Sequence, residues 1–201
     1  MQQKNKKYAN IYIDDVFVCS LQAITVLKHN LQVGQVLQKD QLESLQLDSE
    51  KNAAFDRSIK FLNIRLRSTQ EMKEYLLSKG YMAQTVQYCI EKLGDYKYLD
   101  DRSFAKVYIA SKGQKNGKNK IAYELRQFGV CSTIIDSELS KLDSFVGLFK
   151  LIQKKYKGDK NKIIDYCIGR GYRYEEVKDT LDKYLMELEC TAIEHGYKNF
   201  K

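Results

Sequence analysis

Apolar positions recur along most of the chain at steps of three or four residues, the period of a helix with one buried face. Three stretches of this kind carry a glycine at the same point, namely Gly80, Gly129 and Gly171, spaced 49 and 42 residues apart. Four positions before each glycine stands Leu or Cys, one after stands Tyr or Val, and ten after stands Ile or Leu. The pattern predicts two amphipathic helices joined by a tight turn, used three times.

The glycine is expected to follow the end of the first helix in each pair. The backbone turns left-handed there, which glycine does without steric cost, and the apolar residue after it closes a hydrophobic contact. A third apolar-periodic segment precedes each pair and begins near a phenylalanine: Phe55, Phe104 or Phe145. Each repeat is therefore predicted to be a trio of helices.

Polar residues at the helix starts agree with this interpretation. Ser68 to Glu71 (STQE) has the spacing of a capping box before the middle helix of the first trio. Asp100 and Asp159 stand where they can cap helices in the second and third trios.

The first 50 residues follow another pattern. NIYIDDVFVC (10–19) alternates around Asp14 and Asp15, which predicts a β-hairpin although the usual Asn-Gly or Asp-Gly turn is missing. A short helix is expected near 20–30, a connection around Gly34, and another helix near 39–47. The chain is predicted to be mainly α, with a small α+β segment at 1–50 and helix trios at 51–98, 99–142 and 143–201, the last including a C-terminal tail.

Three segments of this repeat resemble the motifs of the RecX family of bacterial regulators of the recombinase RecA. They are RLRSTQEMKEYLLSKGY (65–81), YLDDRSFAKVY (98–108) and GKNKIAYELRQFGV (117–130). The hairpin is similar to the N-terminal extension of Gram-positive members, with Asp15 where a glycine is more usual. The resemblance is looser from residue 143 onward, where Cys167 and Tyr184 depart from the leucine-like pattern.

The resemblance implies an elongated, curved array of three tandem three-helix repeats. It also implies binding along the groove of the RecA nucleoprotein filament, with inhibition of ATPase, strand-exchange and co-protease activity. Such a protein would modulate DNA repair and the SOS response. The repeat by itself indicates only a solenoid-like body whose long surface suits an extended partner.

Composition fits a folded cytosolic protein: 43% of the 201 residues are hydrophobic, 30% are charged, and there is no proline to interrupt a helix. The five cysteines lie far apart without a C-x-x-C pair and are expected to be reduced core residues. The start of the chain lacks the apolar run of a signal peptide, and no stretch is long enough for a membrane span. We therefore expect a cytoplasmic monomer without membrane contact.

Positive charge is concentrated after the first 50 residues. The net charge is +8; residues 1–50 hold five Lys/Arg against six Asp/Glu, and 51–201 hold 29 against 20. The segment from first to middle helix is basic in every trio, at 57–67, 112–120 and 150–162. These segments and the following helix supply the candidate partner- or DNA-binding residues Arg57, Lys60, Arg65, Arg67, Lys112, Lys115, Lys118, Lys120, Arg126, Lys154, Lys155, Lys157, Lys160 and Lys162.

Regular stacking of the trios would align the three clusters in a basic stripe, whereas the simpler alternative is that lysines solvate exposed turns. The third helices are more acidic, with Glu175, Glu176, Asp179 and Asp182 in the last trio. An acidic second helix argues against a DNA-reading helix-turn-helix, because that helix must approach phosphates. Three functions remain: a regulator bound to the RecA filament, a nucleic-acid-binding protein acting alone through the same stripe, or a passive scaffold.

Catalytic motifs are weak. GQKNGKNK (113–120) resembles a P-loop, but its glycines are too close, Asn119 replaces the Ser or Thr that binds magnesium, and a helix precedes it; we expect a flexible basic loop. Asp100 and Asp101 are neighbours at a helix start and suit capping better than a metal site. Only His29 and His195 are available for histidine chemistry. We expect a protein without enzymatic activity, metal or cofactor.

Overall fold

The computed structural model describes residues 7–198 of the chain. Within that range it contains ten helices and two strands, which confirms a mainly α protein with an N-terminal hairpin. Two compact units can be distinguished, the first ending at Asp100 and the second beginning at Asp101. Residues 1–6, at the basic start, and 199–201, at the end of the expected C-terminal tail, lie outside the described residues.

The expected hairpin is formed by strands β1 (Tyr8–Ile13) and β2 (Val16–Gln22), which pair antiparallel. Asp14 and Asp15 form the two-residue turn with φ of 48° and 62°. Both values are positive, as in the turn type that matches the twist of hairpin strands, and aspartate is one of the few residues besides glycine that tolerates this conformation. An Asp-Asp pair thus replaces the usual Asn-Gly.

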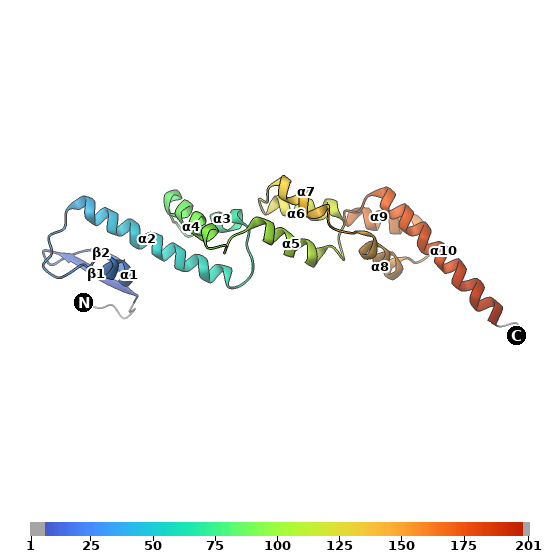
Figure 1. The fold of residues 1–201 in the computed structure, drawn as a ribbon, viewed down its shortest axis with the longest axis horizontal. Coiled ribbons are helices and arrows are strands. Elements are labelled where there is room, and N and C mark those ends of the chain that lie inside the picture. Colours follow the sequence, from blue (N-terminus) through green and yellow to red (C-terminus); the bar gives the residue numbers. More distant parts are fainter. Residues whose placement is uncertain (1–6, 199–201) are drawn as a thin grey trace. The chain divides into compact units, whose positions relative to one another are not determined.

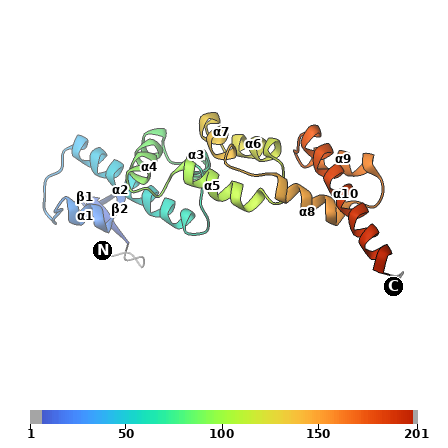
Figure 2. The ribbon, with the colours of Figure 1, turned by 45° about the vertical axis from the view of Figure 1, so that its right-hand side comes forward.

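Helix α1 (Ala23–Lys28) follows the hairpin, and a connection containing Gly34 leads to α2 (Lys39–Leu62). The prediction of a separate helix near 39–47 is wrong, because α2 runs unbroken for 24 residues into the first trio. Its sequence contains neither glycine nor proline, so nothing in the backbone forces a break. The hairpin and α1 lie beside the first part of α2 in both views (Figures 1 and 2).

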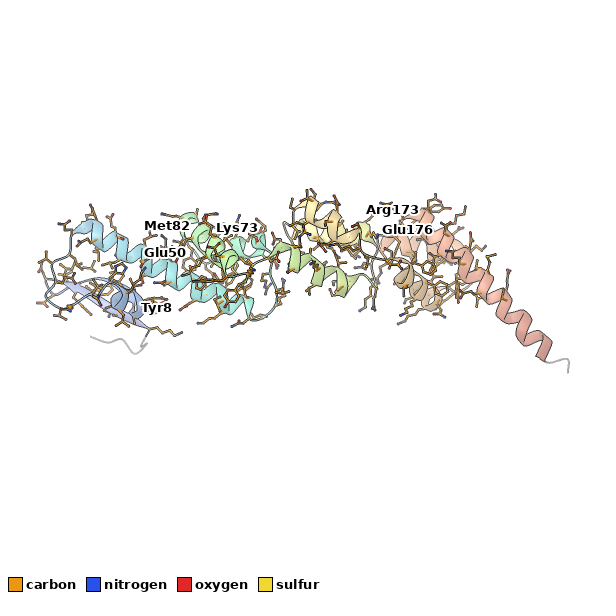
Figure 3. The ribbon with its side chains drawn as sticks, viewed as in Figure 1. Tyr8, Glu50, Lys73, Met82, Arg173 and Glu176 are labelled. Atoms are coloured by element: carbon orange, nitrogen blue, oxygen red, sulfur yellow. The ribbon has the colours of Figure 1, made fainter. Side chains whose placement is uncertain are left out.

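The first trio consists of α2, α3 (Thr69–Ser78) and α4 (Ala83–Asp95). Its core is centred on Met72, Leu76, Cys89 and Leu93, all fully buried. The same helix α2 also supports the hairpin, since the amide of Gln22 donates a hydrogen bond of 2.7 Å to the Ser49 hydroxyl. Glu50 of α2 accepts a bond of 3.4 Å from the amide of Met82, which precedes α4 (Figure 3).

The second unit contains the other two trios, each with its own core. One consists of α5 (Asp101–Lys112), α6 (Lys118–Gln127) and α7 (Ser132–Leu139). The other consists of α8 (Phe145–Lys155), α9 (Lys160–Gly169) and α10 (Tyr174–Lys198). The tandem trios predicted from the glycine spacing are thereby confirmed. Helix α10 continues past α8 and α9 in Figures 1 and 2.

All three glycine turns adopt the expected left-handed backbone, with φ of 84° at Gly80, 73° at Gly129 and 86° at Gly171. In each turn the glycine amide and the next amide donate hydrogen bonds back to carbonyls of the last helical turn. In the first repeat these bonds are Gly80 to Leu77, 2.9 Å, and Tyr81 to Leu76, 3.4 Å. This is the double-bonded helix ending in which glycine is favoured.

Two of the predicted caps are present. The Ser68 hydroxyl accepts from the Glu71 amide at 3.1 Å and the Glu71 carboxylate accepts from the Ser68 amide at 3.2 Å, which completes the capping box of α3. The Asp159 carboxylate accepts from the Lys162 amide at 3.1 Å and caps α9.

The basic loop before α6 is held in place by the third trio, which corrects the expectation of a flexible loop. The amide of Gly117 donates to the Arg170 carbonyl at 2.9 Å, and the amide of Asn119 donates to the Gly171 carbonyl at 3.2 Å. The glycine turn that ends α9 therefore caps the start of α6. A Cβ on Gly117 would come within 2.3 Å of the Gly171 carbonyl carbon, so the approach of the two backbones requires glycine.

The core interpretation of the cysteines holds for only part of the set. All five thiols are free; Cys89 and Cys167 are buried, whereas Cys131 and Cys190 are exposed. Burial raises the pKa of Cys89 and of Cys167 to about 11.

Candidate partner-binding surface

The candidate cations of the first trio fall into two groups. Arg57 and Lys60 are exposed and lie one turn apart on α2. Arg65 and Arg67 lie in the connection to α3, and both contact the Glu71 carboxylate. The guanidinium of Arg67 also lies 4.0 Å from the centre of the Phe61 ring, and its side chain is only 13% exposed.

Arg65 and Arg67 are therefore engaged in holding the capping box of α3. Bonds from both arginines, with the Ser68 amide, keep the pKa of Glu71 below its ordinary value despite partial burial, which acts in the opposite direction. A phosphate could recruit these arginines only by competing with this carboxylate. Of the four candidates, Arg57 and Lys60 are the ones better placed for a partner.

The cluster at 112–120 is also divided. Lys115 is exposed in the loop, whereas Lys112, Lys118 and Lys120 are half-buried. Lys118 lines a cavity of about 300 Å³ together with the carboxylates of Asp143, Glu176 and Asp179. An anionic partner would be repelled by these three carboxylates, so Lys118 is a poor candidate.

In the cluster at 150–162, all lysines are exposed. Within it, Lys162 pairs with Asp159 at 3.1 Å, and the Lys155 ammonium lies 5.9 Å from the centre of the Tyr166 ring. Lys154, Lys157 and Lys160 carry no carboxylate partner among the described residues. Arg126 is exposed in the last turn of α6.

The third helix of the second trio is less acidic at its surface than its sequence suggests. Glu138 of α7 is 4% exposed and pairs with Arg102 of α5 at 3.0 Å and with Lys141 at 2.9 Å. These cations, Lys141 foremost, lower the pKa of Glu138 and keep it ionised. Glu138 thus joins α5 to α7 and contributes no exposed negative charge.

A cleft that the sequence did not indicate lies in the first unit, between the hairpin, α2 and the turn after α3. We call it the hairpin cleft; it has a volume of about 360 Å³. The lining side chains that matter for chemistry are Tyr8, Asp56, Arg57, Lys60, Tyr75 and Tyr81. They are separated by up to 73 residues in the chain, so no local pattern could bring them together.

Two tyrosines that line the hairpin cleft affect the charge of Arg57, which lines it too. Tyr81 and then Tyr75 raise the pKa of Arg57 above its ordinary value through their oxygens. The Tyr75 ring is fixed in turn by stacking on Phe61, with ring centres 3.8 Å apart. Tyr8, the first residue of β1, is labelled in Figure 3.

Neither a metal site nor a membrane-spanning helix is found in the described part of the chain. Among the described residues, no group of three or more His, Cys, Asp or Glu side chains is placed to share a metal ion. Between residues 7 and 198, no helix combines the length and the hydropathy needed to cross a membrane.

Comparison with known proteins gives a consistent family. Residues 1–38 match the model described as the regulatory protein RecX N-terminal domain, 54–93 the first RecX three-helix domain, and 100–139 the second. Solved structures of the same fold include one described as regulatory protein RecX, with a TM-score of 0.71, 20% identity and coverage of 88% of this chain and 95% of that one. RecX from Lactobacillus salivarius has a TM-score of 0.62, with 18% identity and coverage of 68% and 97%.

Curated relatives agree along nearly the whole length. Regulatory protein RecX of Clostridium acetobutylicum is 29% identical over 92% of this chain and 94% of its own. Regulatory protein RecX of Clostridium tetani is 32% identical over 92% of both chains. With these relatives and three domain models that follow one another in order, the chain belongs to the RecX family of regulatory proteins.

Proposed function

We propose that this protein regulates the recombinase RecA by binding along the RecA nucleoprotein filament. Bound there, it inhibits ATPase, strand-exchange and co-protease activity and so modulates DNA repair and the SOS response. It acts in the cytoplasm as a non-enzymatic monomer without a cofactor. The observation that carries the proposal is membership of the RecX family along 92% of the chain.

The exposed cations of the three basic clusters supply the contact surface. Well-placed cations in the second unit include Lys115, Lys154 and Lys157, which are exposed and have no carboxylate partner among the described residues. A RecA–DNA filament offers phosphates and acidic side chains, and exposed cations accelerate and orient such an encounter more than they tighten it. Lys118 is left out, because it lies beside Asp143 and Glu176.

The test is inhibition of RecA ATPase and strand exchange on single-stranded DNA, titrated with the protein. Changing Lys115, Lys154 and Lys157 to Gln should raise the half-inhibitory concentration about tenfold, or roughly 1.4 kcal/mol, with a weaker dependence on salt. The matched control changes Lys97, Lys106 and Lys178 to Gln, which removes the same charge from exposed positions outside the clusters. Equal inhibition by both variants would exclude this surface, and no inhibition by the unaltered protein would reject the function.

A parallel titration on bare DNA at matched salt separates this function from nucleic-acid binding without RecA. Tight binding to bare DNA with no effect on RecA would favour the independent nucleic-acid-binding protein. Neither effect would be expected of a passive scaffold.

A further inference from the structure

The hairpin cleft has the size of a small-molecule site and is built from separate elements. Its volume of about 360 Å³ lies at the lower end of the range of ligand pockets. The hairpin contributes Tyr8, α2 contributes Arg57 and Lys60, and the segment after α3 contributes Tyr81. A site of this construction exists only when the hairpin is packed on the first trio.

The cleft is cationic. Lys7, Arg57 and Lys60 line it against the single carboxylate of Asp56. Among the described residues, neither Arg57 nor Lys60 forms an ion pair with a carboxylate, in contrast to Arg65 and Arg67 a short distance along the chain. Tyr81 and Tyr75 raise the pKa of Arg57, so its guanidinium keeps its charge in the cleft. An anion of phosphate geometry suits such a pair of cations.

The cleft is also aromatic. Within the described residues, the rings of Tyr8 and Tyr81 stack on no other ring, and each is half-buried. Tyr75, by contrast, is already stacked on Phe61. Ring faces beside cations are the combination by which proteins hold a nucleobase and its phosphate, because every base presents a face for stacking.

From these observations we propose that the hairpin cleft binds one nucleotide of a single-stranded nucleic acid. Its phosphate lies on Arg57 and Lys60, and its base lies against Tyr8. A base within a duplex is excluded, since both its faces are covered by neighbours and a cleft of this volume cannot admit a helix. A free mononucleotide shares the same chemistry but lacks the flanking phosphates that would reach Lys7.

This site shares Arg57 and Lys60 with the proposed filament-binding surface, but its test needs no RecA. The two proposals can therefore fail separately. If the protein binds the oligonucleotide but does not inhibit RecA, the filament-binding proposal is rejected. If it inhibits RecA but does not bind the oligonucleotide, the hairpin-cleft proposal is rejected.

The chain contains no tryptophan, so Tyr8→Trp places a single indole in the cleft. We expect its fluorescence to be quenched by a thymidine decamer, and to a smaller extent by an abasic decamer with the same phosphates. Thymidine monophosphate should bind at least tenfold more weakly than the thymidine decamer. Arg57→Gln with Lys60→Gln in this background should lower the decamer affinity about tenfold and reduce the salt slope by about 0.7 for each phosphate that the protein no longer neutralises. Lys106→Gln with Lys178→Gln is the control of equal charge and should change the affinity less than twofold.

A second measurement uses protein without the tryptophan, in case Tyr8→Trp itself disturbs the cleft. Anisotropy of a labelled decamer, with the otherwise unaltered chain and its Arg57→Gln/Lys60→Gln variant, should show the same tenfold loss. The proposal is overturned if that variant binds like the control, or if the abasic decamer quenches as strongly as the thymidine decamer. It is also overturned if the monophosphate binds as tightly as the decamer, or if poly-glutamate does, which would assign the cleft to an acidic peptide.

Discussion

Two turns with the same local geometry, at Gly80 and at Gly171, have opposite surroundings. Both glycines have a left-handed backbone, and both turns close with the same pair of hydrogen bonds. A Cβ on Gly80 would meet no heavy atom within 4 Å among the described residues, whereas a Cβ on Gly171 would lie 2.4 Å from Cβ of Lys120. In the first turn glycine is thus required only by the left-handed backbone. In the third turn it is also required by the close contact between two trios.

The two middle helices of the second unit differ correspondingly at their starts. Helix α9 is capped by its own Asp159. Helix α6 has Gly117 at that position, without a side-chain cap, and its first amides are satisfied by the carbonyls of Arg170 and Gly171. One helix start is therefore complete within its trio, and the other depends on the next trio.

The largest effect is expected for Gly171→Ala. The new Cβ adds a clash with the Lys120 backbone nitrogen at 2.5 Å to the cost of a positive φ in a residue with a side chain. We expect a loss of about 3 kcal/mol in the free energy of unfolding. Urea denaturation followed by circular dichroism measures it, and a loss no greater than that of Gly80→Ala would show that the added Cβ causes no clash at the joint.

Gly117→Ala separates the clash from the backbone term. Gly117 has φ of −75°, which any residue adopts, but its Cβ would lie 2.3 Å from the Gly171 carbonyl carbon. We expect a loss of about 2 kcal/mol, together with faster hydrogen exchange of the Gly171-bonded amide of Asn119. Unchanged exchange at Asn119 would mean that the two trios stay docked and the clash is relieved elsewhere.

Gly80→Ala isolates the backbone term alone. With open space around the Cβ, the variant should lose about 1 kcal/mol in the same denaturation experiment. Gly94→Ala is the matched control, because Gly94 lies inside α4 with equally open surroundings and no positive φ. That control should be neutral or slightly stabilising, since alanine favours a helix.

The smallest effect concerns the self-capped start of α9. Hydrogen bonds from the Lys162 amide and side chain lower the pKa of Asp159 below its ordinary 3.8. The stabilising contribution of the carboxylate is therefore complete above pH 3.8 and is lost as the pH falls through the lower pKa of the folded state. Asp159→Asn keeps a cap that does not titrate, so the difference in melting temperature between the two proteins should narrow from pH 6 to pH 3. A constant difference would contradict the role of the charge.

The features that the sequence predicts correctly are those determined within a few residues. The glycine turns, the Ser68–Glu71 capping box and the Asp159 cap depend on neighbouring backbone groups, so residue type and spacing are enough to predict each of them. The apolar period locates the trios for the same reason. The break expected at residue 50 is wrong because the polar run at 48–52 lacks glycine and proline, and polar residues alone do not end a helix.

Features that depend on distant segments could not be predicted in this way. Lys115 and Lys118 look alike in the sequence, yet one is exposed and the other faces the carboxylates of the third trio. Glu138 would be taken for a surface charge from the sequence alone, yet it is buried and pairs with cations from α5 and from the residues after α7. Alignment of the basic clusters in one stripe stays a prediction.

The unbroken course of α2 bears on how the molecule can be divided. Helix α2 has 24 residues and is about 36 Å long. The strands pack against it toward one end, and α3 and α4 pack against it toward the other. A fragment beginning at residue 51 would lose half of this rod as well as the strands, and would leave the start of α4 without Glu50. We therefore expect the hairpin and the first repeat to unfold together, and to occur together in related proteins.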